Sequence, residues 1–271
     1  MRTLTTMIFC TIFFCFAEAD GLEISYSRIN PFTETSIYDT LNNTVNVESI
    51  LLKGEIFPGD YNRLLDFIRI DTNRFWRSHG FILASPGGDI EEALWIARLV
   101  KGTYAEVFVG PATGPCVSAC FFIFASAARR EAHPGSLGVH RPYVHPKHLI
   151  SLSPLQAESL QKDILKRARL QLEDQQVPTS IIDTMFQRAS TEVYWLTKLE
   201  IEDQLGRRPP WYEQFLIARC GLDKNLEKHY FQTNDSRLLK RVLDVDSCGL
   251  RLSRPDSERF LNAEFRNGQK P

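Results

Sequence analysis

Short apolar segments alternate with segments of helical spacing through the middle of the chain, and this alternation constrains the fold more than any other feature. Strands are predicted at residues 49–56, 80–85 and 105–110, each bounded by turn residues. Helices are predicted between them, at residues 58–70 and 89–100. Because strands that alternate with helices favour a parallel sheet covered by helices, we expect an α/β fold.

The alternation continues beyond residue 110, with less regular spacing. Residues 116–127 indicate a buried helix, and residues 136–140 indicate a short strand. Two amphipathic helices are predicted at residues 154–172 and 179–188. One strand-like segment, LEISYSRI, lies upstream of the regular pattern.

The first 19 residues have the pattern of a secretory signal peptide. Arg2 precedes an apolar run that extends from Met7 to Phe16, and AEA at residues 17–19 is a small-x-small cleavage site. The run is too short to span a bilayer comfortably, and no later stretch approaches the length of a membrane helix. We therefore expect a periplasmic or secreted protein with no membrane span after signal removal; the alternative is a short anchor that stays attached.

The charge balance does not favour a charged partner. The chain has 32 Lys and Arg residues, 33 Asp and Glu residues and a net charge of −1. Removal of the signal peptide takes away one residue of each sign, so the net charge stays the same. A nearly neutral chain gives no electrostatic reason to expect nucleic acid or an anionic membrane as partner.

A proline-rich interruption after Gly206, with the sequence RRPPWYEQF, predicts a domain boundary. We expect a signal peptide at residues 1–19, an N-terminal segment at residues 20–47 and an α/β domain at residues 48–206. Residues 207–271 would then form a small C-terminal appendage that carries a disulfide and ends in a disordered tail, FRNGQKP.

Four cysteines remain after signal removal: Cys116, Cys120, Cys220 and Cys248. An even number in an oxidising compartment favours disulfides over free thiols. Of the three pairings, the local ones fit best, which joins Cys116 to Cys120 and Cys220 to Cys248. The alternative for the first two is that both are small buried core residues.

Three short elements contain residue types that could perform catalysis. The first is SPGG at residues 85–88, where two glycines let the backbone approach a ligand and turn its amides toward an oxyanion. The same four residues also suit a plain strand-to-helix turn. Ser118 suits either a helix N-cap or a nucleophile, and His140 stands in a loop after a strand, where an imidazole can act as general base.

Two other kinds of site find little support in the sequence. Four histidines lie close together, but prolines separate them and no HxxxH or CxxC spacing accompanies them, so we expect no metal. They are His133, His140, His145 and His148. The chain also lacks the GxSxG motif of α/β-hydrolases.

In combination, the motifs resemble a known family. The stretches ILLKGEIFPGDYNRLLDFI, FILASPGGDIEEALWIARLV and GPCVSACFFIFASAARREAHPGSLGVHRP are similar to caseinolytic (ClpP-type) serine peptidases of the ClpP/crotonase superfamily, and to their secreted bacterial branch in particular. The resemblance covers residues 48–206 and implies stacked parallel β-sheet units covered by helices. It also implies that the helix at residues 154–172 is the projecting helix through which family members form homo-oligomers.

The resemblance assigns roles to individual residues. It implies that Ser118 is the nucleophile, that His140 is the general base, and that the amides of Gly88 and Ala119 form the oxyanion hole. At the family's aspartate, which orients the histidine, this chain has Val193. Glu192 is the candidate orienting acid, although a one-residue offset in an extended segment turns a side chain to the other face.

The sequence therefore favours a secreted serine hydrolase that acts on peptides or proteins and needs no cofactor. A triad without its acid retains some activity, but an imidazole in the wrong tautomer costs about four orders of magnitude in rate. Two alternatives remain. One is a non-catalytic binding protein of the periplasm with the ClpP fold, favoured by the missing aspartate, and the other is crotonase-type chemistry on acyl thioesters.

Overall fold

The computed structural model describes residues 21–32, 48–78, 80–144, 146–233 and 235–267. The expected signal peptide lies outside these residues, as does most of the expected N-terminal segment. Along the described part of the chain, no helix is long and apolar enough to cross a membrane.

A five-stranded sheet forms the centre of the fold. Its strands are β1 (Glu23–Ser27), β2 (Ser49–Lys53), β3 (Phe81–Ala84), β4 (Glu106–Val109) and β6 (Arg129–Ala132). They lie in the order β1-β2-β3-β4-β6. The pairs β2–β3, β3–β4 and β4–β6 are parallel, and β1 adds an antiparallel edge. The predicted parallel sheet is confirmed.

The sequence pattern does not predict β6, because its residues RREA are mostly charged. Arg129 and Arg130 are nevertheless buried. Arg129 Nη1 forms ion pairs with Glu106 at 2.6 Å and with Asp246 at 3.2 Å. Burial alone would lower the pKa of Arg129, but these two carboxylates outweigh that effect and raise it. Distant acidic partners therefore allow a charged segment to form a buried strand.

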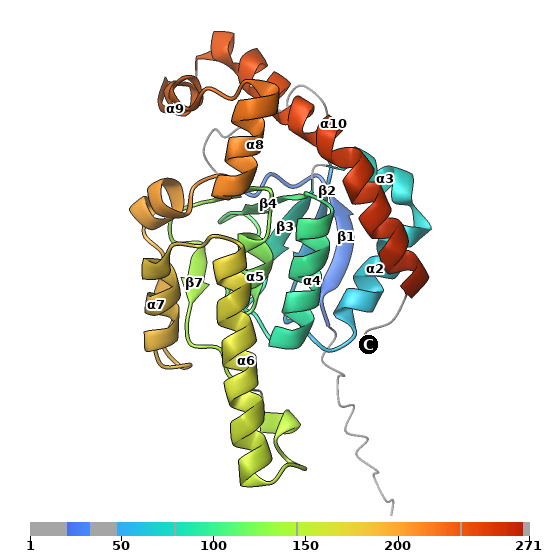
Figure 1. The fold of residues 1–271 in the computed structure, drawn as a ribbon, viewed down its shortest axis with the longest axis vertical. Helices are drawn as coiled ribbons and strands as arrows, with labels where there is room; N and C mark the ends of the chain where they lie inside the picture. Colours follow the sequence, from blue (N-terminus) through green and yellow to red (C-terminus); the bar gives the residue numbers. More distant parts are fainter. Residues whose placement is uncertain (1–20, 33–47, 79, 145, 234, 268–271) are drawn as a thin grey trace, which may run out of the picture.

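Helices cover one face of the sheet (Figure 1). They are α2 (Asp60–Ile70), α4 (Ile90–Gly102) and α5 (Cys120–Ala125), and the short α3 (Thr72–Arg77) follows α2. Ile50 and Phe81 point from the strands into the apolar cluster on this face. Their neighbours Leu51 and Ile82 belong to a separate cluster, because successive side chains of a strand point to opposite faces.

Three C-terminal helices follow, and the last two pack on the second face of the sheet. They are α8 (Pro210–Cys220), α9 (Lys224–Thr233) and α10 (Ser236–Asn267). Tyr230 of α9 and Val242 of α10 pack in one cluster with Leu51, Ile82 and Phe108 of the sheet. This segment is therefore part of the core and is not the small appendage that we expected.

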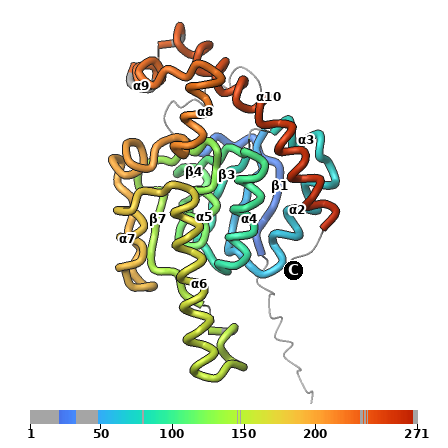
Figure 2. Tube along the Cα trace, in the orientation of Figure 1, coloured from blue at the N-terminus to red at the C-terminus, as the bar shows by residue number. Residues whose placement is uncertain are grey.

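The long helix α10 runs back along the molecule and crosses α4 and α2 (Figures 1 and 2). Near its end, Glu264 accepts a hydrogen bond from Tyr61 of α2 and pairs with Arg98 of α4 at 2.8 Å. The helix continues to Asn267, so the first three residues of the expected tail are helical. Residues 268–271 lie outside the described residues.

A smaller sheet lies beyond the ends of β2 and β3. Its strands are β5 (Cys116–Val117), β7 (Leu137–Val139) and β8 (Tyr194–Trp195). β5 and β7 are parallel, and β8 is antiparallel to β7. An isolated bridge from Ser85 to Cys116 joins the two sheets, and a second bridge, from Ile56 to Gly88, links the segments that follow β2 and β3.

The prediction of one continuous helix at residues 116–127 is wrong in its first part. Cys116 and Val117 donate backbone hydrogen bonds to Ser136 and Ser85, each at 2.9 Å, and so belong to a strand. The helix α5 begins only at Cys120. Pairing with distant strands therefore overrides the local helical pattern.

Two further helices follow the smaller sheet's first two strands. α6 (Pro154–Asp174) begins at a capping box formed by Ser153 and Gln156 and projects away from the body of the molecule (Figure 1). α7 (Thr179–Gln187) packs beside it. The predictions of both helices are confirmed. Two short elements complete this part, a 3₁₀ turn at Pro146–His148 and a π-helix at Glu200–Leu205.

Candidate active site

Ser118 stands on a sharp turn between β5 and α5. Its backbone φ is 58°, in the left-handed region that non-glycine residues seldom adopt. The Ser118 amide donates to the Gly138 carbonyl at 2.9 Å, and its carbonyl accepts from Phe121 at 3.0 Å. These bonds hold the turn in a conformation that costs energy on its own. Strained backbone of this kind is typical of functional positions, and a strand–turn–helix serine is the arrangement of a nucleophile elbow.

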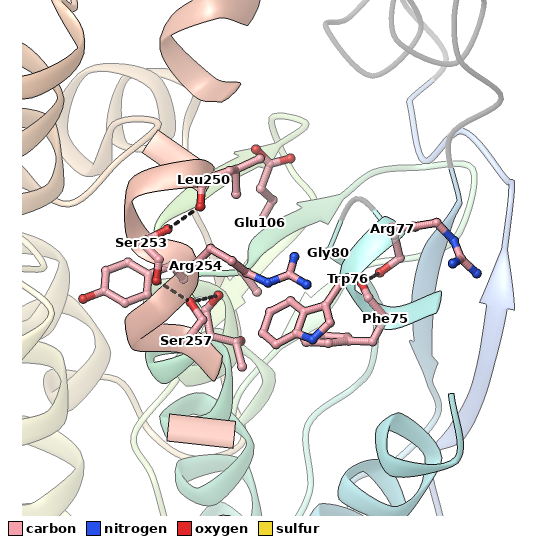
Figure 3. A pocket seen from close by; sticks show the side chains of 13 residues that line it. Phe75, Trp76, Arg77, Gly80, Glu106, Leu250, Ser253, Arg254 and Ser257 are labelled. Atoms are coloured by element: carbon pink, nitrogen blue, oxygen red, sulfur yellow. Dashed lines mark hydrogen bonds between the residues drawn. The ribbon is translucent and has the colours of Figure 1, made fainter. Parts of the chain in front are cut away.

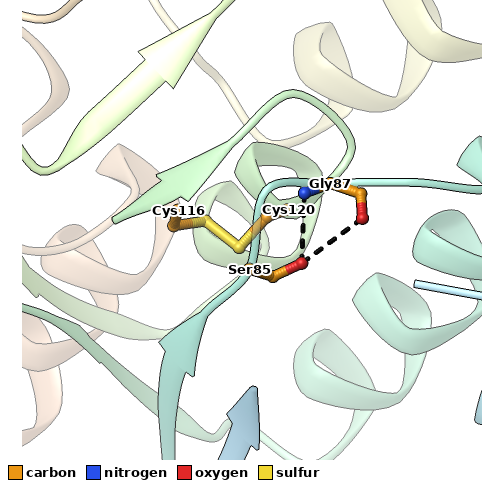
Figure 4. Close-up of a disulfide and its surroundings, with 4 residues drawn as sticks. All are labelled: Ser85, Gly87, Cys116 and Cys120. Carbon is orange, nitrogen blue, oxygen red and sulfur yellow. Dashed lines mark hydrogen bonds between the residues drawn. A yellow bond between two sulfur atoms is a disulfide. The ribbon is translucent and has the colours of Figure 1, made fainter. Parts of the chain in front are cut away.

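The two cysteines beside Ser118 form a disulfide. Cys116 and Cys120 are bonded at an S–S distance of 2.08 Å, and both are fully buried. Figure 4 shows the bridge beside the turn at Ser85 and Gly87. The predicted pairing is therefore confirmed, and the disulfide closes the loop that contains Ser118.

The SPGG segment lies directly against Ser118. A Cβ atom on Gly87 would lie 2.6 Å from Ser118 Cβ and 3.0 Å from the Ala119 amide nitrogen. Gly87 also has a φ of 99°. The Ser85 hydroxyl holds this turn by accepting from the Gly87 amide at 3.1 Å (Figure 4). Only glycine allows this approach, so the segment does more than reverse the chain.

Two backbone amides at this place have no acceptor. Among the residues that the structure describes, neither Gly88 N–H nor Ala119 N–H donates a hydrogen bond. The parallel bridge at Gly88 uses the Gly87 carbonyl and the Asp89 amide, each at 2.8 Å from Ile56. Unpaired amides near a serine can stabilise a developing negative charge on a substrate oxygen.

His140 follows β7, the strand that pairs with β5. Val117 lies opposite Gly138 in this parallel pair, so Ser118 and His140 leave the same end of the smaller sheet. The imidazole is largely buried, with Nδ1 at 3.0 Å from the Arg141 carbonyl oxygen. No hydrogen bond joins it to Ser118 among the described residues. Catalytic hydrogen bonds are often long before substrate binds, so this geometry is compatible with a base.

An apolar residue lies opposite His140 in the strand register. In the antiparallel pair of β7 and β8, Val139 lies opposite Tyr194, and the next step of this register brings His140 opposite Val193. The Val193 side chain lies over Gly138. Glu192 is exposed, and within the described residues its carboxylate has no hydrogen bond to His140. The structure thus places Gly87 against Ser118 and Ala119, and the parallel pairing of β5 and β7 leads Ser118 and His140 off the same end of the smaller sheet, while Glu192 is exposed.

A cavity of about 380 Å³ opens beside Gly88. Its walls are mostly apolar and come from the segment after β2, the start of α4, the segment before α6 and the side of α6. The apolar residues are Ile56, Pro58, Ile90, Tyr143, Val144, Leu152, Leu160 and Ile164. At its edge, His148 Nε2 lies 3.0 Å from the Asp89 carboxylate. The cavity adjoins one of the two unpaired amides.

Another cavity, of about 230 Å³, lies at the opposite ends of the strands (Figure 3). It is bounded by Gly80 before β3, by Glu106 at the start of β4, and by α10. Arg254 of α10 stacks over Trp76, at 3.9 Å from the ring centroid. Because Ser118 and His140 lie beyond the carboxyl ends of the strands, this cavity is separate from the candidate site.

Sequence reasoning missed Arg130, which supports the helix that follows Ser118. Its guanidinium donates to the Ala125 carbonyl at the end of α5, and to the carbonyls of Leu205 and Gly206. Burial lowers the pKa of Arg130 to about 9. The only signal in the sequence is a pair of arginines inside an otherwise apolar stretch, which does not reveal their partners.

Within the described ranges, no group of three or more His, Cys, Asp or Glu side chains is arranged to hold a metal ion. His145, one of the four clustered histidines, lies outside those ranges.

No protein-family model matches the chain, and no curated protein matches it. Among solved structures, it is similar to a ClpP1 mutant from Listeria monocytogenes, with 18% identity, coverage of 62% of this chain and 93% of that chain, and a TM-score of 0.42. It is also similar to a mutant of the membrane-bound stomatin-specific protease 1510-N, with 16% identity, coverage of 56% and 74%, and a TM-score of 0.40. It is also similar to an enoyl-CoA hydratase from Geobacillus kaustophilus, with 14% identity, coverage of 90% of this chain and 92% of that chain, and a TM-score of 0.34.

Proposed function

We propose that this protein is a secreted serine hydrolase that cleaves peptides or proteins, with Ser118 as nucleophile and His140 as general base. The observation that carries the proposal is the turn at Ser118. A serine with a left-handed φ stands between a strand and a helix, beside the Gly88 and Ala119 amides, which have no acceptor among the described residues. This combination suits attack on a carbonyl carbon.

The reaction would proceed through an acyl-enzyme. Ser118 Oγ attacks the carbonyl carbon while His140 Nε2 accepts the hydroxyl proton. The Gly88 and Ala119 amides stabilise the oxyanion, and loss of one such donor typically costs about 10²–10³ in rate. His140 then donates the proton to the leaving amine, and water hydrolyses the ester with His140 again acting as base.

The cavity beside Gly88 supports a preference for an apolar substrate side chain. Its walls are largely apolar, and its volume of about 380 Å³ is in the range of small-ligand sites. A substrate whose carbonyl oxygen reaches the Gly88 amide would place a neighbouring side chain at this opening. We propose that the residue next to the scissile bond is apolar.

Two disulfides support an oxidising compartment. Cys116–Cys120 and Cys220–Cys248 are bonded at S–S distances of 2.08 Å and 2.03 Å. Structural disulfides persist in the periplasm or outside the cell and are rare in a reducing cytosol. Together with the expected signal peptide, they underlie our proposal of a periplasmic or secreted location.

The proposal is tested by labelling with a fluorophosphonate probe, which reacts with activated serines. Protein without residues 1–19 is labelled under oxidising conditions, beside Ser118→Ala, His140→Ala and Ser151→Ala, the last an exposed serine that serves as control. We expect the wild type and Ser151→Ala to label and the other two variants to stay unlabelled. A folded wild type that does not label would contradict the proposal.

One observation favours a second candidate function, a non-catalytic binding protein. Val193 lies where an orienting acid would be expected, and the described residues show no hydrogen bond between Ser118 and His140. In that case peptides would bind without being cleaved. Peptide binding measured by calorimetry, together with an absence of labelling, would distinguish this candidate from the hydrolase.

We also propose that copies of the chain associate through α6. Leu155 at its start is 76% exposed, and Ile150 in the preceding segment is 84% exposed, although both are large and apolar. Light scattering on the purified protein tests this proposal. We expect an oligomer for the wild type and a smaller species for Leu155→Glu, whereas a monomeric wild type would contradict it.

A further inference from the structure

We propose that the backbone carbonyl of Arg141 takes the place of the carboxylate that orients the histidine in a complete triad, and that the Arg141 side chain keeps this carbonyl in position. The inference rests on the proposed function, because it concerns the base of that reaction. It assigns Arg141 the role of a positioning residue.

The contact between His140 and Arg141 determines the tautomer. His140 Nδ1 lies 3.0 Å from the Arg141 carbonyl oxygen. A carbonyl oxygen can only accept a hydrogen bond, so Nδ1 must carry the proton. In the neutral imidazole, Nε2 then has the lone pair. Among the described residues Nε2 has no hydrogen-bond partner, so it is available to take a proton from Ser118.

Two constraints act on the residue that provides this carbonyl. The Arg141 Nε atom donates to the Phe186 carbonyl at the end of α7, at 2.8 Å. Pro142 follows directly, and a residue before proline is restricted to extended backbone conformations. These constraints limit rotation of the peptide unit that faces His140.

Gln161 of α6 pins the next part of the same loop. Its side-chain oxygen accepts from the Val144 amide at 3.0 Å, and its side-chain nitrogen donates to the Pro142 carbonyl at 3.4 Å. The loop from His140 to Val144 is therefore anchored on two helices. Pre-organisation of this kind is what a fixed imidazole orientation requires.

The position of the missing acid is occupied by an apolar residue. The strand register brings Val193 opposite His140, and its side chain lies over Gly138. The Arg141 carbonyl can select the same tautomer as a carboxylate, but it carries a dipole and no net charge. It therefore stabilises the imidazolium less, because hydrogen bonds to ionised acceptors are roughly twice as strong.

The first test reads the tautomer directly. Long-range ¹H–¹⁵N spectra of protein labelled with ¹⁵N-histidine distinguish protonation at Nδ1 from protonation at Nε2, and His140→Ala identifies the signals. For wild-type His140 at a pH where the ring is neutral, we expect the Nδ1–H form. An Nε2–H form, or the mixture that a free imidazole shows, would overturn the inference.

The second test removes the anchor. In Arg141→Ala we expect the Nε2–H form to appear and the rate of fluorophosphonate labelling to fall by about tenfold or more. Arg188→Ala is the matched control, because Arg188 stacks over Tyr194 at 5.0 Å and lies near the same strand without contacting His140. If His140 has the same tautomer in Arg141→Ala as in Arg188→Ala, and the two variants label at the same rate, the positioning role proposed for Arg141 is wrong.

A third comparison supplies the absent charge. We expect Val193→Asp to label about tenfold faster than Val193→Asn, since only the aspartate adds a charge opposite His140. Equal rates for the two variants, with Nδ1–H retained in both, would show that the base gains nothing from a charged partner, and would contradict the weaker stabilisation of the imidazolium that we assign to the Arg141 carbonyl.

The failure of this inference is distinguishable from failure of the proposed function. If the wild type does not label, the hydrolase proposal fails, while the spectrum still reports the tautomer of His140. If the wild type labels but His140 is in the Nε2–H form, the hydrolase proposal stands and the role of Arg141 is wrong.

Discussion

The α/β domain and the C-terminal helices each contain one disulfide, and the two bridges constrain different parts of the structure. Cys116–Cys120 spans four residues and encloses Ser118. Cys220–Cys248 spans 28 residues and joins α8 to α10. The first constrains a turn at the candidate site, whereas the second holds together two helices of the C-terminal segment. We therefore expect changes at the first bridge to affect the candidate site and changes at the second to affect stability, and the following variants test this expectation.

The largest loss of stability is expected where the two regions share buried charges. Asp246 of α10 pairs with Arg129 at 3.2 Å and with Arg208 at 2.7 Å. Asp246→Asn leaves two buried guanidiniums without this charge, and breaking a buried pair typically costs about 3–5 kcal/mol. Urea unfolding measures the change. Asp256→Asn, on the same helix but in an exposed pair, is expected to cost at most about 1 kcal/mol; equal losses would contradict the role given to the buried cluster.

The longer disulfide is expected to affect stability without affecting the site. In the chain-entropy model, Cys220→Ala with Cys248→Ala costs about 3–4 kcal/mol, because the closed loop in the unfolded chain is long. Well below the unfolding midpoint, the labelling rate of Ser118 should stay within about twofold of the wild type. A larger change in labelling would show that the two regions are coupled.

The crowded glycine beside Ser118 should give the opposite result. In Gly87→Ala the new methyl would lie 2.6 Å from Ser118 Cβ. Displacement of the serine by about 1 Å is expected to lower the labelling rate about 10²-fold. Gly135→Ala is the matched control, since Gly135 also has a positive φ, 79°, but nothing within 4 Å of its Cβ position. In that control we expect only the strain of a positive φ at an alanine, without displacement of Ser118. Equal labelling rates for the two variants would contradict the close approach of Gly87 to Ser118.

The shorter disulfide should combine a small stability effect with a clear effect on the site. The Cys116–Cys120 bridge closes a much shorter loop in the unfolded chain, so its removal in Cys116→Ala with Cys120→Ala is expected to cost about 2 kcal/mol. The labelling rate should nevertheless fall by about tenfold, because the turn at Ser118 loses its brace. Two results would contradict the different roles assigned to the two bridges. One is a larger loss of stability than in Cys220→Ala with Cys248→Ala, and the other is an unchanged labelling rate.

The smallest effect is expected at Glu192. Its carboxylate is exposed and has no hydrogen bond to His140 among the described residues. Glu192→Gln should therefore label within about twofold of the wild type. A loss as large as that expected for Arg141→Ala would reinstate Glu192 as the orienting acid.

The sequence alone determined the features that local pattern encodes. Alternating strands and helices predicted the parallel sheet, and the glycines of SPGG marked a close approach of the backbone at residues 85–88. The even number of cysteines predicted both disulfides. The strands, helices and glycine turn depend on residues that are neighbours in the chain. The number of cysteines is a property of the sequence itself, so neither kind of feature requires knowledge of the fold.

Only the tertiary structure decided which distant groups meet. β6 is buried because Arg129 finds Glu106 and Asp246, and the C-terminal helices belong to the core because Tyr230 and Val242 meet the sheet. Likewise, strand register brings Val193 opposite His140, and a backbone carbonyl reaches its Nδ1 atom. A one-dimensional pattern records which side chains are apolar or charged, but the partner that satisfies a buried charge or orients an imidazole is chosen by packing between segments far apart in the chain.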